Sequence, residues 1–307
     1  MTSPTRPIAL ILNKGSGSGT APELGERLAI HFRAAGRQVL LTITESGGEI
    51  AAAVDAALAA DAAAVVAGGG DGTVSAVASR LVGHDTPLGV LALGTMNHLA
   101  RDLGIPLDPD AAANVILGGH TTAIDLGQVN GRVFVNNASL GLYPQIVRVR
   151  QRHPATGLRK WIIATWVTLK ILARHRSMAI RLDADGEVVL RRTPIVFVGN
   201  NEYRAAGLDA GSRESLTDGT LAIYIVNAGG RRHPFRLLRL AWHMVLGKAL
   251  DGDHLELLRT GAATVESKEL MLHMALDGEV EMFRSPLEFR VLPAALSVFV
   301  PHPEVRR

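Results

Sequence analysis

The first part of the chain alternates short apolar runs with longer amphipathic stretches. The apolar runs have the length of buried strands, and they are Ile8–Asn13, Val39–Thr44, Ala62–Ala67 and Leu88–Leu93. The amphipathic stretches predict helices at about Ala21–Ala35, Gly48–Ala60, Val74–Leu81 and His98–Leu103. Strands that alternate with helices predict a parallel sheet with helices on both faces, and ligands of such sheets bind at the carboxyl ends of the strands.

After a helix at Asp108–Gly119, which ends on a glycine, the pattern changes to short strands separated by turn signals such as Asn130-Gly131 and Asp185-Gly186,. The predicted strands are Ala123–Val129, Arg132–Ala138, Met178–Ala184, Glu187–Leu190, Pro194–Asn200, Leu221–Val226, Thr264–Ser267, Met271–Leu276 and Leu287–Val291, with a last apolar run at Leu296–Val300. We therefore expect two domains, an α/β domain at 1–121 and a β-rich domain at 122–295.

A run of three glycines follows the apolar run Ala62–Ala67 and leads through Asp71 into a helical pattern. Glycine lets the backbone approach a ligand closely, and the free amides at a helix N-terminus favour an anion. This turn therefore predicts a site for a nucleotide phosphate. An acid among such amides is suited to a hydrated Mg²⁺, which we expect Asp71 to organise.

Two further turns lie at the ends of predicted strands. Leu93–Asn97 (LGTMN) follows the fourth apolar run, and Lys14–Gly19 (KGSGSG) follows the first. If the sheet is parallel, these turns and the glycine run share one edge of it. A turn rich in glycine and serine is also common as a plain connection, so the Lys14–Gly19 turn by itself is open to both interpretations.

The ordered set of motifs Gly69–Thr73 (GGDGT), Gly94–Asn97 (GTMN) with Ala100-Arg101, and Leu276–Glu279 (LDGE) resembles the diacylglycerol kinase catalytic family of bacterial soluble lipid kinases. This family belongs to a superfamily with NAD kinases and sphingosine kinases. The matching pattern extends over residues 8 to 301. The resemblance implies an N-terminal Rossmann-like domain and a C-terminal β-sandwich-like domain with the active site in the cleft between them. It also implies that residues 296–307 return to the first domain.

The resemblance assigns roles to particular residues. It implies ATP and Mg²⁺ as cofactors, with Glu279 as the base that takes the proton of the acceptor hydroxyl and Asp71 as the residue that organises the metal. In the first nucleotide loop, where the family has Asn-Pro-x-Ser-Gly, Lys14 replaces the proline. The implied nucleotide-binding residues are Asn13, Ser16, Gly17, Thr44, Gly69, Gly70, Asp71, Gly72, Thr73, Gly94, Thr95 and Asn97. An ordinary strand residue remains the alternative for Thr44.

The segment Ser215–Leu221 (SLTDGTL) resembles the family's regulatory Mg²⁺ turn, with Asp218, Ser215 and Thr220 as the implied ligands. Hard cations prefer such oxygen ligands. Family members commonly have more acids here, and Arg213 and Thr217 stand where acids are expected. A plain Asp-Gly turn therefore remains the alternative.

Asparagines lie in two further turns of the second domain, Asn136–Gly141 (NNASLG) and Asn200-Asn201. The resemblance places Asn136–Gly141 at the domain junction, where it could contact substrate. Asn and Ser side chains also stabilise turns by hydrogen bonding their own backbone. Both interpretations are open from the sequence.

Composition and charge exclude several classes of protein. There are no cysteines among the 307 residues, which excludes disulfides, thiolate zinc sites and cysteine nucleophiles,. Hydrophobic residues make up 47% and charged residues 20%, which is typical of a globular chain,. We expect no signal peptide at 1–7 and no membrane-spanning run,. The net charge is +3, and the positive charge is concentrated in two segments. Residues 144–177 include eight Lys/Arg and residues 219–250 include five, and neither segment contains an Asp or Glu.

The apolar segment Trp161–Ala173 lies in a predicted helical insertion at about 145–177 and has basic residues at both ends. It is too short to span a bilayer, so it is either a core helix or a helix at an anionic membrane surface, and the basic flanks favour the membrane. Pro234–Leu250 could add a second contact. Signatures of nucleic-acid binding are missing and aromatic residues total 4%,. The expected location is the cytoplasm, peripherally at the inner face of the membrane, and a homodimer stays open.

The family resemblance, together with the glycine turns and the basic segments, predicts an ATP-dependent lipid kinase. The first choice of acceptor is diacylglycerol, which would be converted to phosphatidic acid. Phosphatidylglycerol, sphingoid bases and ceramide remain open because motifs do not encode the shape of a lipid pocket. Two alternatives are a soluble nucleotide kinase of the NAD kinase kind and a non-catalytic lipid or nucleotide sensor on the same fold. The sensor alternative is motivated by three departures from the family's pattern: Lys14 replaces the usual proline, Ser75 replaces the usual asparagine, and the metal turn has fewer acids.

Overall fold

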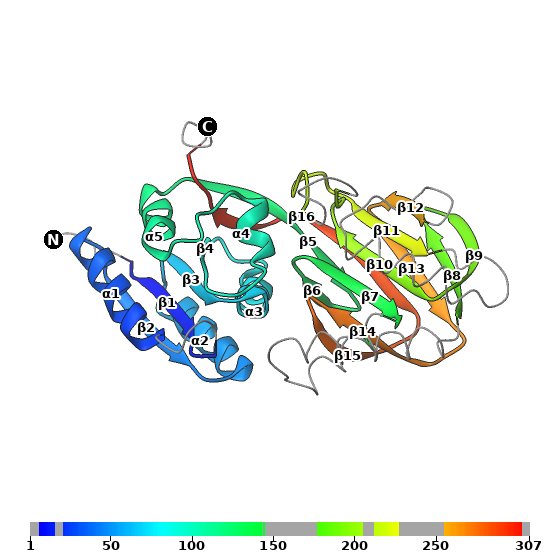
Figure 1. Cartoon of the computed structure of the whole chain (residues 1–307), viewed down its shortest axis with the longest axis horizontal. Coiled ribbons are helices and arrows are strands. Elements are labelled where there is room, and N and C mark those ends of the chain that lie inside the picture. Colours follow the sequence, from blue (N-terminus) through cyan, green and yellow to red (C-terminus); the bar gives the residue numbers. More distant parts are fainter. Residues whose placement is uncertain are drawn as a thin grey trace, which may run out of the picture. The chain divides into compact units, whose positions relative to one another are not determined.

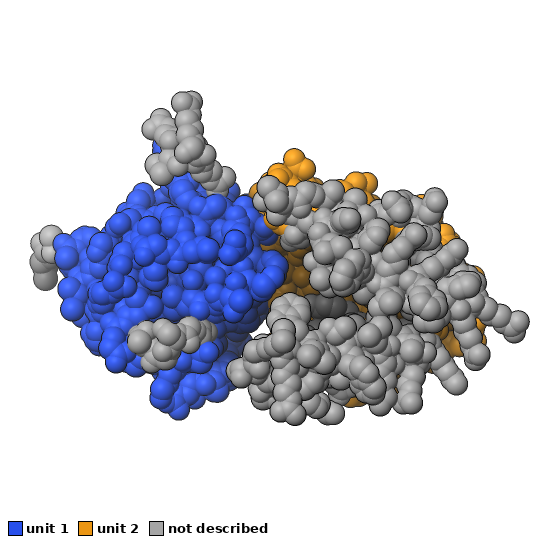
Figure 2. Space-filling view, in the orientation of Figure 1, with its two compact units in different colours: residues 1–126, 293–307 blue, residues 127–292 orange. Residues whose placement is uncertain are grey.

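The computed structural model describes residues 6–15, 21–142, 144, 177–204, 212–226 and 255–302. The chain divides into two compact units, which are coloured separately in Figure 2. Unit 1 comprises Met1–Leu126 and Pro293–Arg307, and unit 2 comprises Gly127–Leu292. The expected boundary lay a few residues earlier, between 121 and 122. The two helical segments expected to contact a membrane, Trp161–Ala173 and Pro234–Leu250, lie outside the described residues.

Unit 1 is a parallel sheet covered by helices (Figure 1). Its strands are β1 (Ile8–Asn13), β2 (Val39–Thr44), β3 (Ala64–Gly69), β4 (Leu88–Ala92) and the C-terminal part of β16 (Leu287–Phe299). They pair in the order β2-β1-β3-β4-β16. Its helices are α1 (Ala21–Ala34), α2 (Gly47–Ala59), α3 (Asp71–Leu81), α4 (His98–Asp102) and α5 (Pro109–Gly118). Helix α1 contacts α5, and α2 contacts α3, so the helices form two groups against the sheet. The predicted α/β fold is confirmed.

The helices of unit 1 follow from local sequence rules. On α3 the predicted apolar face is buried, with Val74, Val77, Ala78 and Leu81 all inaccessible or nearly so. Helix α5 begins with Asp108, whose Oδ1 accepts the amide of Ala111, and ends at Gly119 in the left-handed conformation,. These signals are local, which is why the helix bounds agree closely with the prediction.

Unit 2 consists of two packed antiparallel sheets. Its strands are β6 (Arg132–Phe134), β7 (Asn137–Gly141), β8 (Met178–Ala184), β9 (Glu187–Thr193), β10 (Ile195–Asn200), β11 (Leu221–Val226), β12 (Leu255–Thr260), β13 (Ala262–Ser267), β14 (Met271–Leu276), β15 (Glu279–Arg284), the end of β5 (Thr121–Val129) and the start of β16. One sheet has the order β12-β11-β10-β7-β14-β15, and the other contains β16-β13-β8-β9, with β5 paired to β16 and β6 paired to β5. Alternate apolar residues of both sheets, such as Leu182, Val198, Ile223 and Leu287, form one core,. The predicted β-sandwich is confirmed.

The structure corrects the predicted strands at three places. The run expected as one strand at Arg132–Ala138 is two strands, because the amides of Val135 and Asn136 bond to a side chain and leave the ladder. The two strands expected at Leu287–Val291 and Leu296–Val300 are one continuous strand, β16. Strands β12 and β15 were not predicted, because charged residues interrupt their apolar pattern.

No helix among the described parts of the chain has the length and hydropathy that crossing a bilayer requires.

Candidate active site

The carboxyl ends of strands β1 to β4 bring most of the predicted nucleotide-binding residues to one edge of the sheet in unit 1. Asn13 ends β1, and its Nδ2 donates a hydrogen bond to Oγ1 of Thr73 on α3 (3.1 Å). Lys14 donates its amide to the carbonyl of Thr44 at the end of β2 (2.9 Å). Hydrogen bonds therefore connect the end of β1 to the end of β2 and to the helix that follows β3. Ser16 and Gly17 lie outside the described residues.

The two glycine turns pack against each other, backbone on backbone. A Cβ added to Gly94 would lie 2.5 Å from the Cα of Gly70, closer than real Cβ atoms approach any neighbour. A Cβ on Gly69 would lie 2.4 Å from the side chain of Thr73. Glycine at these positions is therefore required by the contact itself, and the turns after β3 and β4 form a single surface.

Asp71 connects the same two turns. Its Oδ2 accepts the amide of Asn97 (2.9 Å) and its Oδ1 accepts the amide of His98 (2.7 Å). Asn97, in the left-handed conformation, bonds both the amide and the carbonyl of Gly94 through its side chain. Sequence reasoning expected Asp71 to organise a metal and missed this connection. Each carboxylate oxygen still has a second acceptor position, which suits the water shell of a hydrated Mg²⁺.

The start of α3 fits a phosphate. The N-cap residue is Gly70, and among the described residues no side-chain hydrogen bond caps the helix. An 11-residue helix then begins with Asp71-Gly72-Thr73. Amides in such a first turn and the helix dipole favour an anion. Gly72 is exposed at this turn, as is Thr95 on the neighbouring turn.

Thr44 at the end of β2 and Lys14 just after β1 bond to the neighbouring strand end. The hydroxyl of Thr44 is buried and donates to the carbonyl of Leu12 (3.4 Å), as in an ordinary strand residue. Lys14, which replaces the usual proline, forms an exposed ion pair with Glu45 (2.7 Å). Their hydrogen bond raises the pKa of Lys14 and lowers the pKa of Glu45.

In unit 2 the turn Asp277-Gly278-Glu279 connects β14 to β15. The carboxylate of Asp277 accepts three backbone amides from residues 135–137, which form the β6–β7 loop and the first residue of β7. They are the amides of Val135 (2.8 Å), Asn136 (2.8 Å) and Asn137 (3.0 Å). Glu279 follows as the exposed first residue of β15. The side chain proposed as the base is therefore solvent-accessible, and its turn is held by the residue two positions before it.

Sequence reasoning missed Arg213 as part of this arrangement. The residue is only 4% exposed, and its guanidinium donates to the carbonyls of Val135 (2.7 Å) and Asn200 (3.3 Å). It also donates to Oδ1 of Asn136 (2.9 Å). The signal that could have found it is an arginine in a turn where the family has acids.

The asparagines of unit 2 bond to backbone and to Arg213. Nδ2 of Asn200 donates to the carbonyl of Val135 (2.9 Å), and Asn136 accepts from Arg213. Both bonds reach segments far away along the chain, and contact of these asparagines with substrate stays a prediction. Ser139 is buried on β7, and its hydroxyl has no hydrogen-bond partner among the described residues.

The predicted metal turn offers a poor set of ligands. Asp218 is exposed, and the Ser215 hydroxyl accepts the amide of Thr217 and lies 3.3 Å from its hydroxyl. The described residues contain no cluster of His, Asp and Glu able to hold a metal ion. A single exposed carboxylate with two hydroxyl-bearing neighbours does not fit a dedicated divalent-cation site.

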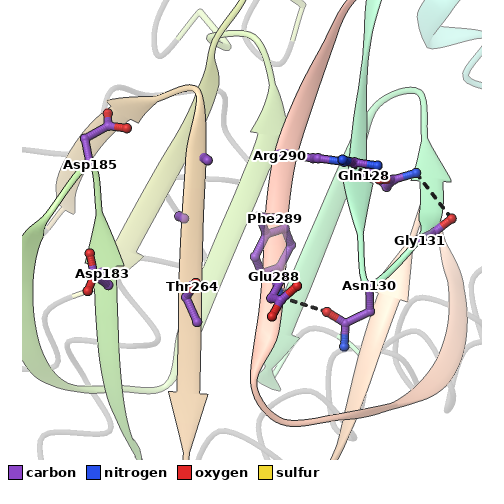
Figure 3. A pocket seen from close by; sticks show the side chains of 11 residues that line it. Gln128, Asn130, Gly131, Asp183, Asp185, Thr264, Glu288, Phe289 and Arg290 are labelled. Atoms are coloured by element: carbon purple, nitrogen blue, oxygen red, sulfur yellow. Dashed lines mark hydrogen bonds between the residues drawn. The ribbon is translucent and has the colours of Figure 1, made fainter.

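The pocket in Figure 3 has a volume of about 580 Å³ and lies on the sheet of unit 2 that contains β8, β13 and β16. Asp183, Asp185, Glu288 and Arg290 are among its polar lining residues. Oδ1 of Asn130 accepts the amide of Glu288 there (2.7 Å). None of the residues predicted for the nucleotide, the base or the metal lines this pocket, so it does not belong to the candidate active site.

Comparisons with known proteins agree with this architecture. Residues 7–129 match the family described as "Diacylglycerol kinase catalytic domain", and residues 148–300 match "YegS C-terminal NAD kinase beta sandwich-like domain". A protein named diacylglycerol kinase from Mycobacterium tuberculosis is 30% identical over 306 residues, covering 96% of this chain and 95% of the relative. A protein named as a YegS-like lipid kinase from Pseudomonas fluorescens is 31% identical over 275 residues, covering 88% of each chain.

Solved structures show the same fold. A structure described as a diacylglycerol kinase from Bacillus anthracis superimposes with a TM-score of 0.71 at 20% identity, covering 99% of this chain and 100% of the other. Yeast NADH kinase complexed with NADH superimposes with a TM-score of 0.54 at 12% identity, covering 98% of this chain and 85% of the other. At these identities the likeness concerns the fold alone.

Proposed function

The chain belongs to the family of diacylglycerol kinases and YegS-like lipid kinases, and from this premise we propose that it transfers the γ-phosphoryl group of ATP to a lipid hydroxyl, with diacylglycerol as acceptor and phosphatidic acid as product. The observation that supports this proposal best is that the two glycine turns of unit 1 pack directly against each other. The backbones of Gly70 and Gly94 are in contact, and the Asp71 carboxylate, in the first turn, accepts the backbone amides of Asn97 and His98 at the end of the second.

The chemistry in unit 1 is positioning and charge neutralisation. In phosphoryl transfer the protein mainly orients the reactants and stabilises negative charge. The amides at the start of α3 are suited to bind phosphate oxygens, and the hydrogen bond between Asn13 and Thr73 connects the end of β1 to that helix. Mg²⁺, when bound with ATP, would neutralise phosphate charge, and Asp71 is the residue that would hold its water shell.

In unit 2 the proposed base is Glu279. As the oxygen of the lipid hydroxyl forms its bond to the γ-phosphorus, the bond to the ADP oxygen breaks and the hydroxyl proton moves to the Glu279 carboxylate. The Glu279 carboxylate is exposed and forms no ion pair with the described residues, so it is available for this transfer. The bonds of Asp277 to the β6–β7 loop hold the turn that presents Glu279.

We also propose that the protein works in the cytoplasm, peripherally at the inner face of the membrane. The basic runs at 144–177 and 219–250 favour an anionic lipid surface,. Sedimentation with vesicles tests this directly. Binding to vesicles that contain phosphatidylglycerol, weakened by salt, is the expected result, and equal binding to purely zwitterionic vesicles contradicts it.

The function is tested by incubating the protein with Mg²⁺, ATP labelled on the γ-phosphate, extracted total lipids and NAD. Label in a lipid that comigrates with phosphatidic acid is the expected result. Label on NAD would favour the alternative of a nucleotide kinase, which the fold similarity to yeast NADH kinase motivates. Label in neither would favour a sensor. Label in another lipid would keep the lipid kinase and replace the acceptor.

A further inference from the structure

The Val135–Asn136 peptide group in unit 2 is held from both ends. Its carbonyl accepts hydrogen bonds from the Arg213 guanidinium (2.7 Å) and from Nδ2 of Asn200 (2.9 Å). Its amide donates to the carboxylate of Asp277 (2.8 Å). A cation and a carboxylate therefore bond opposite ends of one peptide dipole, an arrangement in which each hydrogen bond strengthens the next.

The next two carbonyl groups along the chain also accept hydrogen bonds. The carbonyl of Asn136 accepts the amide of Asn200 (2.9 Å) and the hydroxyl of Tyr203 (3.1 Å). The carbonyl of Asn137 accepts the amide of Asp277 (2.9 Å). The Arg213 guanidinium also lies 5.8 Å from the centre of the Tyr203 ring, within the range of a cation–π contact,.

We propose that Arg213 supplies the cation that organises this loop, in place of a divalent metal in the adjacent Ser215–Leu221 turn, and that it is a positioning residue for the turn containing Glu279. A guanidinium fits because it is always charged, planar and rich in donors, and here it satisfies two carbonyls and one amide oxygen,. The turn itself has one exposed carboxylate, which does not fit a resident metal. Unit 2 accordingly reaches its native arrangement without a bound divalent cation.

Arg213 is connected to the turn that contains Glu279 through the β6–β7 loop and the carboxylate of Asp277. Arg213 holds the β6–β7 loop, the loop's three amides hold the carboxylate of Asp277, and Glu279 follows two residues later at the start of β15. Only the last step, the use of Glu279 as a base, rests on the proposed function. The metal claim and the loop claim are properties of the protein without substrate.

The first test measures thermal unfolding of the full chain without nucleotide, in EDTA and in excess Mg²⁺, for the wild type and for Asp218→Asn. A site filled at about 100 times its Kd would raise the unfolding temperature by roughly 5–10 °C. We expect wild type and Asp218→Asn to respond to Mg²⁺ identically. A rise in the wild type that Asp218→Asn abolishes overturns the proposal. This comparison does not depend on activity.

The second test uses Arg213→Lys, with Arg259→Lys as the matched control. Arg259 also forms a two-point interaction, with Glu202 (2.6 and 2.8 Å), but at the surface. Hydrogen exchange should show loss of protection at the amides of residues 135–137 in Arg213→Lys and not in the control, with the β13 and β16 amides unchanged in both. Unchanged protection at 135–137 overturns the proposal. If Arg213→Lys does not fold, the Mg²⁺ measurement on the wild type and Asp218→Asn decides it.

Kinetics then separate positioning from general destabilisation. In Arg213→Lys we expect kcat to fall on the order of 10²-fold, as a small misplacement of a catalytic group does, with the KM for ATP unchanged and no recovery in excess Mg²⁺. Equal kcat in wild type and Arg213→Lys, together with lost protection, contradicts the positioning role. An inactive wild type contradicts the proposed function instead, and leaves the two physical tests standing.

Discussion

Unit 2 contains the sequence Asp-Gly-Glu twice, and the two copies have the same backbone and different surroundings. Asp185-Gly186 connects β8 to β9 and Asp277-Gly278 connects β14 to β15. Asp185 and Asp277 have φ angles of 53° and 46°, and the glycines 86° and 88°. Both are two-residue hairpin turns with left-handed central residues. In each the glutamate begins the second strand, opposite the residue that ends the first.

The difference lies in what the aspartate bonds. Asp277 accepts three amides from the β6–β7 loop. Asp185 is exposed on the rim of the pocket in Figure 3, and among the described residues its carboxylate makes no hydrogen bond. The local sequence determines the turn, whereas distant segments determine whether it is held rigidly. Only the second turn is therefore suited to present a catalytic carboxylate.

The largest expected effect distinguishes the two glutamates. Glu279→Gln should lower kcat by about 10²–10⁴-fold, because an amide cannot take the proton of the acceptor hydroxyl, while ATP binding is retained. Glu187→Gln, the same change at the same position of the other turn, should leave kcat unaltered. Phosphoryl transfer to lipid is the measurement. Wild-type turnover in Glu279→Gln would remove Glu279 as the base.

The next effect concerns the aspartates and stability. In Asp277→Asn the amide NH₂ takes the place of one carboxylate oxygen and faces a backbone N–H, so we expect a loss of about 3 kcal/mol in the free energy of unfolding. Asp185→Asn should change it by no more than about 0.5 kcal/mol. Denaturant unfolding of both variants checks this. Equal losses would show that the three amide bonds contribute little.

The glycines should behave alike, which tests whether the two turns share a backbone conformation. Gly186 and Gly278 both have a positive φ, and neither would bring an added Cβ within 4 Å of another atom. An alanine in the left-handed region costs roughly 1–2 kcal/mol. Gly186→Ala and Gly278→Ala should therefore lose this amount equally in denaturant unfolding. A difference of more than about 1 kcal/mol would mean that the surroundings also strain one turn.

The smallest effect is a pH dependence at Tyr224 on β11, in the sheet that also contains the second turn. Tyr224 accepts the amide of Tyr203 (2.9 Å), and burial raises its pKa above the usual value. Because the folded-state pKa is above the unfolded one, Tyr224 destabilises the fold only as pH rises from the unfolded pKa, about 10, through the folded pKa. The free energy of unfolding should fall in that window. In Tyr224→Phe the free energy of unfolding should fall less over this pH range than in the wild type. The same pH dependence in both proteins would contradict a raised pKa of Tyr224 as the cause.

The sequence predicted the parts of the molecule whose causes are local. Strand ends, glycine turns and helix starts in unit 1 are each determined by a few consecutive residues, and the parallel sheet brings Asn13, Asp71 and Gly94 together. The contact of Gly70 with Gly94 and the bonds of Asp71 to the second turn needed the structure, because they join residues more than twenty positions apart.

The polar network of unit 2 could not be predicted in the same way. It joins residues 135–137, Asn200, Arg213 and Asp277, which come from four separate segments. An arginine in a turn where the family has acids marks Arg213 as unusual, but nothing near it along the chain indicates which distant groups it bonds. The second Asp-Gly-Glu turn was distinguished from the first by resemblance alone, and the structure supplies the physical difference between them.

The central claim is that the two joined glycine turns bind the phosphates of ATP and that Glu279 acts on the acceptor side. A crystal structure with Mg²⁺ and a non-hydrolysable ATP analogue tests it most directly. The account predicts the triphosphate within hydrogen-bond distance of the amides of residues 71–73 and beside Gly94–Asn97, with the γ-phosphate facing Glu279. A triphosphate bound away from both turns, or one with its γ-phosphate out of reach of Glu279, would contradict it.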